Sequence, residues 1–155
     1  MLHDGRGVPG QLAGGGIDRA KFDTWIAEVR KLAVEKDRLN VTDVTIGEWL
    51  SSCAAEPDGT WPCLPVRDLL EQLDCEKIRS GFHTGVFNNR GVHSRAVGAG
   101  GSQERDLAAR YRAYAAPLQG SYPQTAAVLE SIAKNYDADG RRHDVDSALW
   151  KEGAR

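Results

Sequence analysis

The residues best suited to bind a ligand lie close together near the middle of the chain. The stretch 85–95 reads GVFNNRGVHSR, and it brings two amides, two guanidiniums and an imidazole into eight residues beside glycine. Arginine offers forked N–H donors that match phosphate and carboxylate groups. These side chains are therefore candidates for an anion-binding or partner-binding loop. The same residues also suit the end of a helix and a turn with solvated charges, so both interpretations stand.

A second, weaker signal follows directly. The run GAGGSQ, residues 98–103, leads from a glycine-rich loop into a predicted helix, and the first backbone N–H groups of a helix can hold an anion. The lysine of a phosphate-binding loop is missing and no strand precedes the run, so an ordinary loop and helix cap are the simpler explanation. The two signals together define one candidate ligand-binding site: Asn88, Asn89, Arg90, His93, Arg95, Gly100, Gly101 and Ser102.

Other chemical groupings are sparse. Asp139, His143 and Asp146 fall at spacings of four and three, so they would share one face of a helix. Carboxylate and imidazole groups at this spacing can bind a divalent ion, although a solvated helix face is the simpler interpretation. No Ser/His/Asp or Cys/His set has a supporting local context. We therefore predict no metal and no cofactor, we identify no catalytic residue, and the balance leans away from an enzyme.

The cysteines do not form a metal-binding pattern. Cys53, Cys63 and Cys75 are separated by gaps of nine and eleven residues, whereas structural zinc sites bring ligands in closer pairs such as C-x2-C. An odd number of cysteines without an apolar leader segment argues for reduced thiols in the cytoplasm. We expect these thiols to be buried or half-buried.

Charge is spread unevenly along the chain. Residues 41–76 hold eight acidic side chains and one basic one, whereas residues 77–112 hold seven basic and two acidic ones. We expect the two blocks to face each other within the fold or to be solvated, and they could also attract oppositely charged partners. The net charge of −2 and the pI of about 6.1 lack the basic character of a general nucleic-acid binder. No stretch approaches 18 apolar residues, so no membrane span is expected.

Hydrophobic periodicity predicts an all-α fold. Apolar residues recur at spacings of three and four in the clearest segments, and no segment alternates as a strand does. Asp18 is expected to cap the first helix and Asn40 to stop it, Thr42 or Asp43 to cap the second, and Ser102 to cap the fifth. Helices are predicted over residues 17–38, 42–52, 62–74, 76–87, 102–118 and 125–150.

Glycine marks the breaks in this helical pattern. Of the 17 glycines, six lie in residues 1–16 and six in residues 81–101. The first group predicts a flexible tail or linker over 1–16, ahead of a single domain over 17–152 that forms a compact bundle of five to seven helices. In the second group, Gly81 and Gly85 lie four residues apart within a predicted helix. That spacing suggests the close approach of a neighbouring helix.

Two runs carry a family resemblance. RSGFHTGVFNNRGVHSR and GGSQERDLAARYRAYA resemble the helical C-terminal regions of large bacterial proteins that have no assigned activity, over most of residues 18–150. This resemblance implies a helical fold and a multidomain context. It carries over no catalytic residue.

These observations favour a cytoplasmic helical module for protein–protein interaction, with another protein as the expected partner. The alternative is a small anion- or phosphate-binding domain, or an enzyme, that uses the basic loop 85–102. Nucleic-acid binding through residues 77–112 is a third and weaker hypothesis.

Overall fold

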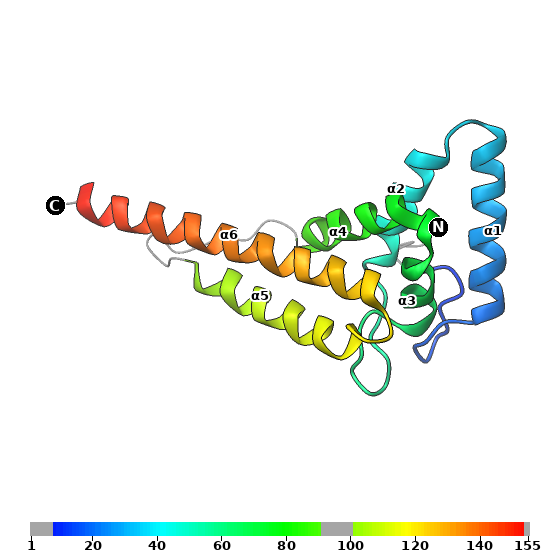
Figure 1. The fold of residues 1–155 in the computed structure, drawn as a ribbon, viewed down its shortest axis with the longest axis horizontal. Helices are drawn as coiled ribbons and strands as arrows, with labels where there is room; N and C mark the ends of the chain where they lie inside the picture. The colour runs from blue at the N-terminus through cyan, green and yellow to red at the C-terminus, as the bar shows by residue number, and fades with distance from the viewer. Residues whose placement is uncertain (1–7, 91–100, 154–155) are drawn as a thin grey trace. The chain divides into compact units, whose positions relative to one another are not determined.

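The computed structural model describes residues 8–90 and 101–153, and within these ranges the secondary structure is helical apart from one isolated β-bridge (Figure 1). The prediction of an all-α bundle of five to seven helices is confirmed. The helices are α1 (Arg19–Glu35), α2 (Leu39–Leu50), α3 (Leu64–Glu71), α4 (Glu76–Arg90), α5 (Ser102–Ala115) and α6 (Pro123–Gly153), with 3-10 turns η1 (Leu73–Cys75) and η2 (Ala116–Leu118). No helix in the described part of the chain is long and apolar enough to cross a membrane.

The chain forms two compact units, Met1–Asn89 and Arg90–Arg155, each held together by contacts among its own residues. The first unit contains α1 to α4, except for the last residue of α4, and the second contains α5 and α6. The expectation of one domain over 17–152 stays a prediction.

Helix α1 begins as its sequence predicts. The Asp18 carboxylate accepts the backbone N–H of Lys21 at 3.1 Å, which satisfies one of the N–H groups left open at a helix start. The end of the helix differs from the prediction. Asp37 adopts a left-handed φ of +53°, and α2 starts at Leu39. Asn40 therefore lies inside the second helix and does not end the first. The first helix ends before Asp37, because aspartate tolerates the left-handed conformation that interrupts the helical backbone there.

Helices α2 and α4 cross at glycines. A Cβ added at Gly81 would overlap the carbonyl oxygen of Val44 and lie 2.7 Å from its carbonyl carbon. A Cβ added at Gly85 would lie 2.7 Å from the carbonyl oxygen of Glu48. The predicted close approach of a neighbouring helix is thus present, and Gly47 of α2 contributes to it from the other side. The crossing forms the centre of the first unit, whose buried side chains include Leu50, Val66, Leu70, Ile78 and Phe82.

Part of the glycine-rich N-terminal segment is built into the first unit. The chain reverses between Gln11 and Ile17, which pair as an antiparallel bridge, and the Asp18 N–H donates to the carbonyl of Gly10 at 2.9 Å. Val8 is 4% exposed. The segment 8–16, which composition assigns to a flexible tail, therefore forms a closed loop that packs on the helices, while residues 1–7 lie outside the described residues.

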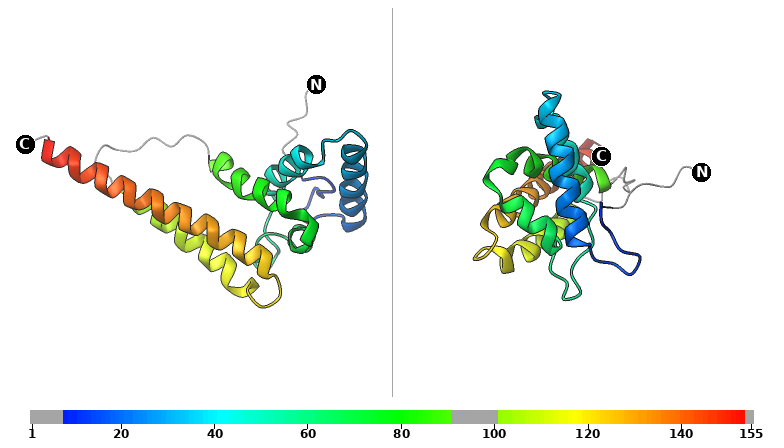
Figure 2. Two further views of the ribbon diagram at one scale, coloured as in Figure 1. Left: turned by 45° about the horizontal axis from the view of Figure 1, so that its top comes forward. Right: turned by 90° about the vertical axis from the view of Figure 1, so that its right-hand side faces the viewer.

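The second unit is an antiparallel helical hairpin (Figure 2). Helix α6 extends over 31 residues, so the predicted continuation of the sixth helix to Trp150 is correct. Small and aliphatic side chains are buried in this unit, including Ala108, Ala115, Leu129, Ile132 and Ala133. At the open end the backbones meet directly, because a Cβ added at Gly101 would lie 2.5 Å from the Cα of Gly140.

Candidate functional site

The described residues of the candidate anion-binding site are divided between the two units and make different contacts. Asn88 is exposed near the end of α4, and the side-chain amide of Asn89 donates to Ser51 Oγ at 2.8 Å and Ser52 Oγ at 3.1 Å within the first unit. His93, Arg95 and Gly100 lie outside the described residues. Arg90, Gly101 and Ser102 belong to the second unit, where the first two make contacts inside the hairpin.

Arg90 holds a buried carboxylate. Its Nη2 lies 2.8 Å from Glu104 Oε1, and the side chains are 18% and 0% exposed. The guanidinium also lies over the ring of Tyr136, 5.4 Å from the ring centre, where the electron-rich face attracts a cation. A cation used in this way has little capacity left for an external anion. The sequence contained a signal for the burial of Glu104. It lies four residues before Ala108, so both occupy the same buried face of α5.

The N-terminus of α5 is also occupied by the chain's own carboxylate. The cap of α5 is Gly101, whose N–H donates to Asp144 Oδ1 at 2.9 Å, and the predicted capping by the Ser102 side chain is wrong. Arg105 pairs with the second oxygen of Asp144. The Gly101 N–H, helped by Arg105, lowers the pKa of Asp144. The position predicted to attract an anion does so, but the anion is a side chain of α6.

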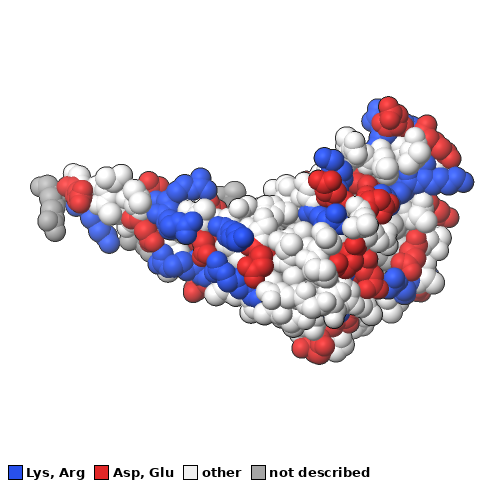
Figure 3. Space-filling model, in the orientation of Figure 1, with Lys and Arg blue, Asp and Glu red and all other residues white. Residues whose placement is uncertain are grey.

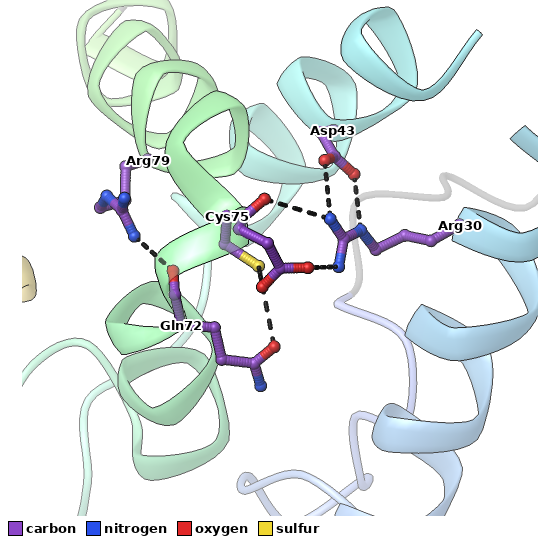
Figure 4. A network of polar contacts seen from close by, with 6 residues as sticks. Arg30, Asp43, Gln72, Cys75 and Arg79 are labelled. Atoms are coloured by element: carbon purple, nitrogen blue, oxygen red, sulfur yellow. Dashed lines mark hydrogen bonds and ion pairs between the residues drawn. The ribbon is translucent and has the colours of Figure 1, made fainter. Parts of the chain in front are cut away.

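The charge blocks find partners within their own units. Acidic residues of the block 41–76 pair with arginines of α1, as shown for Arg30 in Figure 4. Basic residues of the block 77–112 pair with acids of α6, and side chains of both signs lie close together over α5 and α6 (Figure 3). Asp139, from the weak metal pattern, pairs with Arg142, and the described residues contain no cluster of three or more side chains suited to a metal ion.

A polar network of Arg30 links α1 to α2 and η1 (Figure 4). Arg30 binds both carboxylate oxygens of buried Asp43, at 3.0 and 3.1 Å, and reaches Asp74 Oδ2 at 2.9 Å. Burial opposes the charge on Arg30, but these hydrogen bonds outweigh it and raise its pKa. Arg79 donates to the carbonyls of Leu70 and Gln72 at the end of α3. Every contact in this network is internal, which indicates a structural role.

Two hollows lie in the first unit. One is a groove of about 570 Å³ between α1 and α3, with Phe22, Ile26 and Leu69 among its apolar lining residues. The other is a cavity of about 580 Å³ beneath the N-terminal loop. Its walls include Cys53, the segment that follows it, and Cys63. All three cysteines are free and buried, as the sequence predicts.

Exposed apolar side chains lie on α1 and α2. Trp25 and Trp49 stack with ring centres 6.0 Å apart and planes inclined by 27°. Trp49 is 54% exposed, and Leu32, two turns after Trp25 along the same face of α1, is also 54% exposed. Trp25, Leu32 and Trp49 are called the tryptophan surface below. A stacked aromatic pair with one half-exposed ring suits a role in an interface.

These features define an all-helical protein with an exposed aromatic surface and a cavity that contains two thiols. No model of a protein family matches the chain, and neither a curated protein nor a solved structure shows significant similarity to it.

Proposed function

We propose that this chain is a helical interaction module whose tryptophan surface binds a second copy of the same chain. The observation that carries the proposal is the stacked pair Trp25 and Trp49, which leaves more than half of Trp49 exposed. Burial of that half would contribute on the order of 3 kcal/mol per tryptophan, from about 25 cal/mol per Å². Tryptophan is the residue type most enriched among those that dominate binding energy in interfaces.

The spacing along α1 argues for self-association. Trp25 and Leu32 lie on one stripe, seven residues apart. In an antiparallel pair of α1 helices related by a twofold axis, Trp25 of each copy meets Leu32 of the other, so the surface is complementary to itself. Such twofold dimers are the commonest oligomers. The rim carries both signs of charge, Lys21 and Glu28 among them, so two copies would not repel each other strongly.

The alternative, an anion-binding site or enzyme in the segment 85–102, has less support. Among its described residues, Arg90 holds Glu104, and the α5 N-terminus holds Asp144. The pairing of Arg105 and Arg112 with acids of α6 likewise reduces the positive surface that nucleic acid would need. Three free, buried thiols fit the reducing environment of a cytoplasm, which we propose as the location.

Sedimentation velocity over a range of protein concentrations tests the proposal. We expect a concentration-dependent dimer that Trp49→Ser abolishes. Val41→Ser is the matched control, because Val41 is an exposed apolar residue of the same helix, 72% exposed and separated from Trp49 by eight residues. A wild-type chain that stays monomeric at the highest concentration, or equal weakening by both variants, would contradict the proposal.

A further inference from the structure

Cys53 and Cys63 lie at the two ends of a tightly folded loop. Within it, the Glu56 N–H donates to the carbonyl of Thr60 at 2.9 Å. The indole N–H of Trp61 donates to the carbonyl of Cys53, also at 2.9 Å, and its ring packs on Phe82 of α4. These contacts return the chain to its starting point and bring Cys53 and Cys63 to the wall of one cavity, where each thiol affects the pKa of the other.

The two thiols are not equivalent. Cys63 is the residue at the N-cap of α3, where the helix dipole favours a negative charge. The hydrogen bond with Cys53 lowers the pKa of Cys63 against the opposing effect of burial, and the N–H of Val66 lowers it further. The same hydrogen bond, with burial, raises the pKa of Cys53. When one thiol of the pair loses its proton, the N-terminus of α3 favours the thiolate at Cys63, and Cys53 keeps its proton.

A cavity lies directly beside both cysteines. Both cysteines line the hollow of about 580 Å³, although their residues are only 6% and 5% exposed. The opposite wall comes from the N-terminal loop, with Gly14–Gly16 and Ile17. A hollow of this size falls within the range that holds small ligands in proteins. Cys75 differs, because it is 0% exposed and does not line this cavity.

We propose that Cys53 and Cys63 form a thiol–disulfide exchange site that reacts with low-molecular-weight disulfides. Cys63 loses its proton to solvent and attacks one sulfur of the small disulfide. The bond between the two sulfurs of that molecule breaks, and its first half leaves as a thiolate that takes up a proton. The small molecule remains joined to Cys63 as a mixed disulfide.

Cys53 then completes the exchange. Its sulfur attacks Cys63 Sγ, the bond between Cys63 and the small thiol breaks, and the proton of Cys53 leaves with the second small thiol. One small disulfide is reduced to two thiols, and the two protein thiols are oxidised to one disulfide. The assignment of Cys63 as the attacking residue and Cys53 as the resolving residue follows from their different surroundings.

Incubation of the full chain with oxidised glutathione, followed by mass spectrometry, tests the site. Wild-type protein should lose two hydrogens and yield a peptide pair linked through Cys53 and Cys63. Cys53→Ser should accumulate glutathione on Cys63, because the resolving thiol is missing. Cys75→Ser is the matched control and should react as the wild type does. Failure of the wild type to form the Cys53–Cys63 link would overturn the proposal.

A second measurement needs no variant. Iodoacetamide should alkylate Cys63 of the wild-type protein at least about tenfold faster than Cys75 near neutral pH, because only the thiolate reacts. Burial raises the pKa of Cys75 to about 11, so its thiolate is scarce. Equal rates at the two residues, or faster reaction at Cys75, would show that Cys63 is not the activated thiol.

Discussion

The crossing of α2 and α4 makes a sharp prediction for Gly81→Ala. In an isolated helix this substitution would stabilise by about 1 kcal/mol, since alanine is the better helix former. In the folded protein the added Cβ would overlap the Val44 carbonyl oxygen and lie 2.7 and 2.8 Å from the neighbouring carbonyl carbon and Cα. These are backbone atoms, which cannot rotate away, so the two helices must move apart.

The cost follows from the packing around the crossing. Separation of α2 from α4 loosens contacts of Ile46, Ile78 and Phe82, which are at most 2% exposed. Overpacking of this kind costs typically about 1–3 kcal/mol, and occasionally more where the obstacle is rigid. Because the obstacle is backbone, we expect a cost of about 3 kcal/mol, so that after the gain of about 1 kcal/mol in helix propensity the free energy of unfolding falls by about 2 kcal/mol. For a chain of this length that lowers Tm by about 4–8 °C.

Chemical denaturation followed by tryptophan fluorescence measures this change, because Trp61 packs on Phe82 of α4 and reports on the crossing. Gly120→Ala is the control, since a Cβ at Gly120 would meet no atom within 4 Å. That variant should stay within about 0.5 kcal/mol of the wild type. If Gly81→Ala proves as stable as the wild type, the helices do not depend on direct backbone contact and the reasoning fails.

Three further predictions concern the second unit. Arg90→Ala should destabilise it by about 3–5 kcal/mol in denaturation experiments, because it removes the guanidinium beside a fully buried carboxylate, and adding Glu104→Gln should restore much of the loss. The pKa of Asp144 is lowered in the folded state, so its contribution should be present above about pH 4 and vanish at lower pH, where wild type and Asp144→Asn should become equally stable. Burial raises the pKa of Tyr111 to about 12. Above about pH 10 the unfolded state loses a proton that the native state keeps, so the free energy of unfolding should fall as the pH rises from about 10 to 12. In Tyr111→Phe this fall with pH should be less steep.

Local signals predicted much of the fold. Periodic apolar residues located the helices, Asp18 marked the start of α1, and the spacing of Gly81 and Gly85 indicated a close helix crossing. These features depend on residues within one or two helical turns of one another, so the sequence pattern contains them directly. Helix boundaries were less accurate where one residue decided the outcome, as at Asp37.

The candidate sites depended on long-range contacts that local patterns do not contain. Basic residues and glycines near Arg90 suggested an open anion site, but the anions turned out to be Glu104 and Asp144, 14 and 43 residues from their respective partners Arg90 and Gly101. A helix N-terminus attracts negative charge whatever its source. Only the packing of α6 on α5 supplies that charge from within the chain.

The cysteines show the same division. The sequence by itself determined that Cys53, Cys63 and Cys75 would be reduced, buried and too widely spaced for a local zinc site. Only the tertiary structure decided that two of them would meet beside a cavity while the third would stay enclosed. The physical reason is that burial follows from apolar composition, whereas the distance between two thiols depends on how the loop closes and on the helix that begins at its end.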